Sequence, residues 1–195
     1  MAQVEEADEL LVARAQRGDA AAFGSLVTRY QDALFNGLYR MVGHREDAED
    51  LAQEAFVKAF RAIAGFQGRS SFYTWLYSIA YNVVVSHRRK TGSARHLNPA
   101  SLQDSGDDEG GRGLGVADDV ERPEAAAERR ELLARLEAAL ARLEPDQRAI
   151  IVMRDIEGFD YQAIAGVLAC PQGTVKSRLH RARQALREQL KDVVG

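Results

Sequence analysis

The sequence lacks most of the features that mark secreted, membrane-spanning or metal-bound proteins. It has a single cysteine, Cys170, among 195 residues, so neither a disulfide nor a cysteine-rich zinc site can form within the chain. No apolar run approaches the roughly 20 residues that cross a bilayer. Acidic residues stand near the N-terminus, where a signal peptide needs positive charge. We therefore expect a cytoplasmic protein without direct membrane insertion.

Strand signals are also scarce, which determines the expected fold class. The β-branched cluster at 83–85 continues a helical pattern, and residues 150–152 lie inside another. The apolar fraction of 46% is enough for a core. We predict an all-α fold of two small helical domains, residues 1–91 and residues 123–195.

The segment between these domains, residues 92–122, has the composition of a flexible acidic linker. It contains glycines and serines, and between Asp104 and Glu121 it carries seven acids against one arginine. The spacing of these acids matches no calcium-binding loop. We therefore expect neither a metal site nor a cofactor.

Residues 161–183 predict two short helices joined by a tight turn. Ile164 and Val167 have helical spacing, and Pro171 with Gly173 breaks and restarts the chain. The second helix has an apolar stripe of Val175, Leu179, Ala182 and Leu186, and its remaining face carries Lys176, Ser177, His180, Arg181 and Arg183. A basic terminal helix is often only a solvated face, but such a helix does not need the preceding helix and turn. The pattern favours a helix-turn-helix DNA reader, with Cys170 as a small half-buried turn residue.

Helical periodicity predicts three helices before residue 65. The first covers 8–16, and Asp19 can cap the second. The third covers 46–64 and is expected to bury Ala48, Leu51, Ala52, Ala55, Phe56, Ala59, Phe60 and Ile63. Its opposite side carries Asp47, Asp50, Gln53 and Glu54. Acids near a helix N-terminus favour the macrodipole, which explains part of this acidic pattern and leaves the rest open.

The fourth helix, expected over 72–90, concentrates aromatic residues and ends in a basic cluster. Its buried face would consist of Phe72, Leu76, Ile79, Ala80 and Val83. Packing then accounts only in part for Tyr73, Trp75, Tyr77, Tyr81 and Asn82. Aromatic rings near Arg88, Arg89 and Lys90 suit unpaired nucleotides, because rings stack on bases and cations follow phosphates. Aromatic residues on a helix are more often core residues, so both interpretations stay open at this point.

Three segments, taken in their order along the chain, carry a resemblance to a known family. They are DAEDLAQEAFVKAFR at 47–61, FQGRSSFYTWLYSIAYN at 66–82 and GTVKSRLHRAR at 173–183. They are similar to the core-polymerase-binding helix, the promoter-melting segment and the upstream-element reader of bacterial sigma factors. The chain resembles the extracytoplasmic-function (ECF), RpoE-like group of the sigma-70 family over nearly its whole length. The resemblance implies a sigma-2 and a sigma-4 domain, joined by a linker that threads the polymerase.

The resemblance also implies roles for individual residues. The clamp helices of the largest polymerase subunit would contact Asp47, Asp50, Gln53 and Glu54. The single-stranded downstream promoter element would contact Phe66, Arg69, Tyr73, Trp75, Asn82, Arg88 and Arg89. Asn82 would lie beside the pocket for a flipped-out base, where an amide can both donate and accept hydrogen bonds. The upstream element would contact Arg154, Thr174, Lys176, Ser177, His180 and Arg181.

Two positions depart from the family pattern. Ser86 stands where many relatives have an acid, and His180 occupies a position that varies among relatives. The promoter sequence therefore does not carry over from the resemblance.

The sequence thus predicts an ECF RNA polymerase sigma factor that directs promoter-specific transcription initiation in a stress or envelope response. Its expected partners are core RNA polymerase, promoter DNA and an anti-sigma factor. We expect no enzyme activity and no small-molecule substrate, because no nucleophile–base pair or phosphate loop stands out. The alternative is a helix-turn-helix activator that binds duplex DNA independently of core polymerase, and it would need neither the acidic stripe nor the aromatic helix. A sigma mimic that sequesters an inhibitor would keep the helices but could lose the base-contacting residues.

Overall fold

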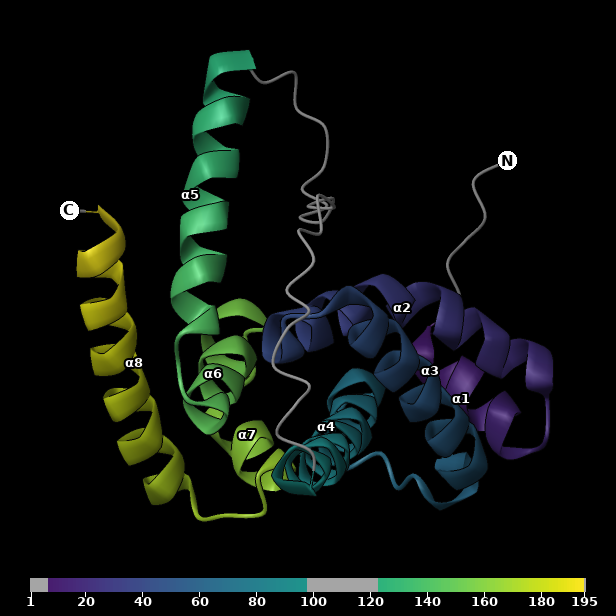
Figure 1. Cartoon of the computed structure of the whole chain (residues 1–195). Coiled ribbons are helices and arrows are strands. Elements are labelled where there is room, and N and C mark those ends of the chain that lie inside the picture. The colour runs from purple at the N-terminus through teal and green to yellow at the C-terminus, as the bar shows by residue number, and fades with distance from the viewer. Residues whose placement is uncertain (1–6, 98–122, 195) are drawn as a thin grey trace.

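Helices make up all the regular structure in the part of the chain that the computed structural model describes, residues 7–97 and 123–194 (Figure 1). These two ranges contain no strand, so the predicted all-α fold class is confirmed. Most of the predicted acidic linker, residues 98–122, lies outside the described residues. None of the described helices is both long and apolar enough to cross a membrane.

The first described range, residues 7–97, forms a helical bundle that we call the N-terminal bundle. Its helices are α1 (Asp8–Gln16), α2 (Ala20–Val42), α3 (Arg45–Ala62), the short η1 (Ile63–Gly65) and α4 (Phe72–Leu97). The long α2 packs against α1, α3 and α4. Helix α4 continues past the expected end of the domain at residue 91. A single glycine inside a helix costs only about 1 kcal/mol relative to alanine, so Gly92 does not end it.

Helix α2 begins and ends at residues suited to those positions. As predicted, Asp19 caps its first turn, where Oδ1 accepts hydrogen bonds from the backbone N–H groups of Ala21 at 3.0 Å and Ala22 at 3.1 Å. Arg14 pairs with the same carboxylate at 2.8 Å and helps to lower the pKa of Asp19. Gly43 ends the helix with φ of 83°, a conformation that favours glycine.

The second described range, residues 123–194, forms the C-terminal bundle. It contains α5 (Pro123–Ala141), α6 (Pro145–Ile151), the π-helical turn η2 (Val152–Ile156), α7 (Tyr161–Val167) and α8 (Gln172–Val194). Helices α7 and α8 are joined by a tight turn in which Ala169 has φ of 48°. Of the predicted apolar stripe, Val175, Leu179 and Ala182 are buried and Leu186 is half-buried. The helix-turn-helix prediction is therefore confirmed, and Cys170 is half-buried as expected.

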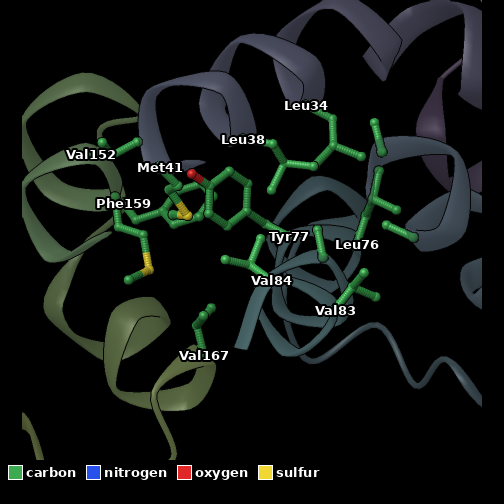
Figure 2. Close-up of a cluster of buried hydrophobic side chains, with 14 of the residues drawn as sticks. Leu34, Leu38, Met41, Leu76, Tyr77, Val83, Val84, Val152, Phe159 and Val167 are labelled. Atoms are coloured by element: carbon green, nitrogen blue, oxygen red, sulfur yellow. The ribbon is translucent and has the colours of Figure 1, made fainter. Parts of the chain in front are cut away.

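One continuous core joins the two bundles. Side chains of α2, α4 and the C-terminal bundle converge in Figure 2, where Tyr77 lies between Leu38, Met41 and Phe159. Helix α2 contacts both α6 and η2, and α4 contacts α7. Helices α2 and α4 therefore both contribute to the junction with the C-terminal bundle, which lies beside them in Figure 1.

Two sequence-based assignments of aromatic residues were wrong. Tyr77, which the helical pattern left only partly packed, has 0% exposure, because the C-terminal bundle covers the side of α4 from which it projects. Phe60, which was expected to be buried, is 48% exposed and contacts Phe23 edge-to-face with a 5.0 Å separation between ring centroids. In both cases tertiary packing, rather than the helical pattern of the sequence, determines how exposed the side chain is.

Candidate nucleic-acid and partner interfaces

The exposed face of α8 presents a row of polar and basic side chains. Lys176, Ser177, His180 and Arg181 are exposed, and Thr174 is half-buried near the start of the helix. Arg181 lies along the helix, with Nε donating to the carbonyl oxygen of Ser177 at 3.5 Å. The structure thus brings together the residues predicted to contact an upstream element, on the side of α8 opposite its buried stripe.

Tyr161, the first residue of α7, lies between Arg154 and the exposed side chains of α8, and its ring contacts both Arg154 and Lys176. The Arg154 guanidinium lies 4.9 Å from the centroid of the Tyr161 ring, and the Lys176 ammonium lies 5.7 Å from it. Arg154 Nη1 also donates to the carbonyl oxygen of Phe159 at 2.7 Å. Arg154 is therefore held in a fixed position beside the start of α8, which sequence spacing alone could not show.

Arg183 has a structural partner. Its Nε donates to Oδ2 of Asp155 at 3.1 Å, and the hydrogen bond raises the pKa of Arg183. This ion pair fixes α8 to the π-helical turn η2. Arg183 was grouped from the sequence with the basic face of α8, but the structure ties it to the scaffold.

The acidic stripe of α3 faces outward. Asp50, Gln53 and Glu54 are exposed, and Asp47 is half-buried with Oδ1 3.8 Å from Nε2 of His87. Glu54 pairs with Lys58 at 2.7 Å, which lowers the pKa of Glu54. None of these four side chains belongs to the buried core of the described residues.

The predicted single-strand contacts fall on two opposite sides of α4. Tyr73 and Asn82 are nine residues apart, which is about two and a half turns of a helix with about 3.6 residues per turn. Trp75, Asn82 and Arg89 recur every seven residues and therefore share one side of the helix. Tyr73 and Arg88 belong to the other side, which faces the C-terminal bundle.

The side of α4 that carries Asn82 is open. Asn82 and Arg89 are exposed, and Trp75 is half-buried with its ring 5.0 Å from that of Phe66. The loop before α4, which contains Phe66 and the exposed Arg69, is held by Gln16, whose Nε2 donates to the Phe66 carbonyl at 2.8 Å. A groove separates this loop from α1. Five of the seven candidate single-strand residues are thus accessible on one side of the bundle.

The other side of α4 faces the C-terminal bundle, which covers Tyr73 but leaves the Arg88 side chain 37% exposed. Tyr73 donates from its hydroxyl to Oε2 of Glu157 at 2.7 Å, and its ring stacks on Tyr30 with 5.2 Å between centroids. Burial raises the pKa of Glu157, which the Tyr73 hydrogen bond and the charge of Arg40 oppose. Arg88 pairs with Asp146 of α6 at 3.2 Å.

Sequence analysis missed Glu157, Phe159 and Asp146. Their partners are distant in the chain: Tyr73 and Glu157 are 84 residues apart, and Arg88 and Asp146 are 58 apart. Helical periodicity reports only on neighbours within a few turns, so no local signal could have identified these pairs.

Comparison with known proteins identifies the family. Residues 26–94 match the family model for Sigma-70 region 2, and residues 133–186 match that for Sigma-70, region 4. The chain is 40% identical over 190 residues to the RNA polymerase sigma-H factor of Pseudomonas aeruginosa, with 97% of each chain covered. It is 36% identical over 187 residues to the ECF RNA polymerase sigma-E factor of Escherichia coli, with 96% of each covered. The chain belongs to the sigma-70 family, in its ECF group of RNA polymerase sigma factors.

Solved structures agree with this assignment. The sigma factor RpoE of Bartonella quintana, in a co-crystal with the anti-sigma factor NepR, is similar with a TM-score of 0.67 and 28% identity. The similarity covers 87% of this chain and 96% of that one. CnrH in complex with the cytosolic domain of CnrY gives a TM-score of 0.66 at 27% identity and covers 96% of this chain and 99% of that one.

A matched pair of tyrosine substitutions tests the chemistry at the junction of the bundles. The hydroxyl of Tyr77 is buried and has no hydrogen-bond partner within the described residues, whereas that of Tyr73 bonds to Glu157. Tyr77→Phe should therefore stabilise the protein by about 1 kcal/mol, since it removes an unpaired polar group. Its Tm should rise by about 2–4 °C for a chain of this size. Tyr73→Phe should lower Tm, and calorimetry that found the two changes to have the same sign would contradict this account.

Proposed function

We propose that this protein is a dissociable promoter-specificity subunit that binds core RNA polymerase and directs transcription initiation. One observation carries this proposal beyond family membership. Three exposed surfaces coexist in one chain: the acidic stripe of α3, the Asn82 side of α4 and the basic face of α8. A duplex-binding activator would need only the last of these.

The acidic stripe of α3 is the proposed polymerase contact. Acids that lie outside the buried core can engage a complementary surface without disturbing the packing of the bundle. The proposed contact residues are Asp47, Asp50, Gln53 and Glu54, and the proposed partner surface is the clamp helices of the largest polymerase subunit. Asp47 is the least accessible of the four, because it lies beside His87.

The Asn82 side of α4 is the proposed contact for the opened downstream element. Trp75 and Phe66 present rings on which unpaired bases can stack, and Arg69 and Arg89 supply positive charge for the phosphates. Asn82 can hydrogen-bond a flipped base through its amide. Tyr73 and Arg88 belong to the same proposed contact set but lie on the side of α4 that faces the C-terminal bundle, where Tyr73 is covered and Arg88 is partly exposed.

The exposed face of α8 is the proposed reader of the upstream duplex. A helix of this kind can lie in the major groove with its first turns against the base edges. Lys176, Ser177, His180 and Arg181 are exposed there, and Arg154 is held beside the start of the helix.

The proposed role needs no catalytic group in this chain, because the polymerase would supply the chemistry. The place of action would be the cytoplasm, where core polymerase and promoters are found. We also propose an anti-sigma factor as a regulatory partner, since one of the solved relatives above, RpoE of Bartonella quintana, is in complex with the anti-sigma factor NepR.

The polymerase contact can be tested by charge reversal on α3. Asp50→Lys with Glu54→Lys should weaken binding to core polymerase by about tenfold or more, equivalent to about 1.4 kcal/mol. Glu9→Lys with Glu144→Lys changes the net charge equally at exposed sites elsewhere and serves as the control. Equal affinities of both double variants in a titration with labelled core polymerase would remove the α3 assignment.

Upstream recognition can be tested on α8 with two arginines. Arg181→Ala should lose about 1–3 kcal/mol of preference for a matched over a scrambled upstream element, if Arg181 reads a base. Arg187→Ala, exposed further along the same helix, should weaken binding to both elements alike. Holoenzyme binding to the two templates at one salt concentration measures the difference. A uniform loss with Arg181→Ala would make it a backbone contact.

The proposed binding of an unpaired downstream base can be tested at Asn82. Asn82 is exposed and its side chain makes no hydrogen bond within the described residues, so Asn82→Ala should leave Tm unchanged. The variant should keep core binding and upstream recognition but impair promoter opening, because only the opened strand offers the base. A template with the downstream element already unpaired should restore opening without base preference at that position. Permanganate footprinting that showed normal, sequence-selective melting would exclude the capture role.

A further inference from the structure

The Tyr161 ring lies against two cationic side chains that come from different elements. Cζ of Arg154, in η2, lies 4.9 Å from the ring centroid, and Nζ of Lys176, in α8, lies 5.7 Å from it. A cation is attracted to the face of an aromatic ring because the ring quadrupole is negative there. One ring therefore contacts two candidate upstream-element residues, one that precedes it in the chain and one that follows it.

The surrounding backbone fixes the place of this ring. Oδ1 of Asp160 accepts a hydrogen bond from the backbone N–H of Ala163 at 2.7 Å, which caps α7 one residue before Tyr161. Phe159 is buried, and its backbone N–H donates to the carbonyl oxygen of Met153 at 2.9 Å. The half-buried Tyr161 ring itself packs against the edge of the core. Tyr161 is thus part of the scaffold on which the two cations rest.

Arg154 is held at the ring from the π-helical turn η2. The backbone N–H of Glu157 donates to the carbonyl oxygen of Val152, five residues earlier, at 2.9 Å, which is the hydrogen bond of a π-helix. Nη1 of Arg154 donates to the carbonyl oxygen of Phe159 at 2.7 Å. A guanidinium has further N–H donors, so this bond and the ring contact orient Arg154 without using its whole capacity to bind an anion.

In the described part of the chain, neither of the two cations forms an ion pair with an acid. Asp155, the neighbour of Arg154 in the sequence, pairs instead with Arg183 at 3.1 Å, and Asp160 caps α7. Two positive charges beside one ring repel each other, and the ring offsets only part of this repulsion. A negatively charged duplex that contacts both cations therefore gains from their being held together.

We propose that Tyr161 is a positioning residue whose ring holds Arg154 and Lys176 together at the start of α8, so that both contact the upstream duplex as one unit. The ring face performs this role, and the hydroxyl is not required for it. Loss of the ring would leave both cations in the chain but would no longer hold them side by side. This inference rests on the proposed function, because Arg154 and Lys176 are proposed DNA contacts.

Nuclear magnetic resonance of the free protein tests the ring contacts without polymerase or DNA. Tyr161→Phe keeps the ring and removes the hydroxyl, whereas Tyr161→Leu removes the ring and keeps an apolar side chain. The ring-current shifts of the Arg154 Nε–H and of the Lys176 side-chain methylene groups should persist in Tyr161→Phe and disappear in Tyr161→Leu. Tyr39→Leu is the matched control, because it removes a half-buried ring from α2. Circular dichroism checks that all three variants keep their helices.

Promoter binding by the holoenzyme tests what the ring contributes to recognition. Core polymerase loaded with Tyr161→Leu should bind a promoter about tenfold more weakly than with the unsubstituted protein, equivalent to about 1.4 kcal/mol. Tyr161→Phe and Tyr39→Leu should stay within about twofold of the unsubstituted protein, because each leaves a ring against the two cations. All measurements use one salt concentration, low enough for the weakest variant to bind.

A double-mutant cycle separates positioning from a general effect on the fold. In a protein that already carries Arg154→Ala and Lys176→Ala, Tyr161→Leu should cost no further affinity, because the ring has no cations left to hold. The same loss from Tyr161→Leu in both backgrounds would overturn the proposal. So would equal losses from Tyr161→Leu and Tyr161→Phe, or unchanged ring-current shifts in Tyr161→Leu. Failure of every holoenzyme to bind the promoter would instead refute the proposed function, while the shifts in the free protein would still decide whether the ring holds the two cations.

Discussion

The approach of Tyr77 and Glu157 to the backbone of Gly37 is the contact on which the arrangement of the two bundles depends. Tyr77 is fully buried, and its ring meets Phe159, so the core of the N-terminal bundle continues without interruption into the C-terminal bundle. Any side chain at position 37 would occupy the space that Glu157 and Tyr77 share. Glycine at position 37 therefore allows the close packing of these two side chains against α2.

Helix α4 has three sides with different surroundings. For this reason the candidate DNA contacts on α4 lie on two different sides of the helix. One side carries Phe72, Leu76 and Ala80 into the N-terminal core. A second side, with Tyr73 and Arg88, meets the C-terminal bundle. The third, which presents Asn82 at a spacing of seven residues from Trp75 and Arg89, is open. One helix can have three such sides because residues that are three, four or seven positions apart lie on the same side. Residues that are nine positions apart lie on opposite sides.

The features that the sequence predicted correctly depend on neighbours a few residues apart. The cap at Asp19, the buried stripe of α8 and the extent of α1 follow from local spacing and side-chain chemistry. Tyr77, Phe60 and Arg183 behave differently from the local pattern because their partners come from other elements. The exposed candidate surfaces on α3 and α8 were therefore predictable, whereas the covering of Tyr73 by Glu157 was not.

The junction of the two bundles combines an aromatic contact between Tyr77 and Phe159 with a partly buried carboxyl group, Glu157. An interface meant to be permanent gains most from apolar contacts, whereas a buried carboxylate must give up its hydration. Glu157 is bonded by a neutral tyrosine hydroxyl, and its pKa is raised by burial. A carboxyl group whose pKa is raised on folding binds its proton more tightly in the folded protein, so protonation of Glu157 as the pH falls favours the folded state. Phe159 and Tyr77 contribute apolar contact at this junction, and the hydrogen bond from Tyr73 offsets part of the cost of burying the Glu157 carboxyl group.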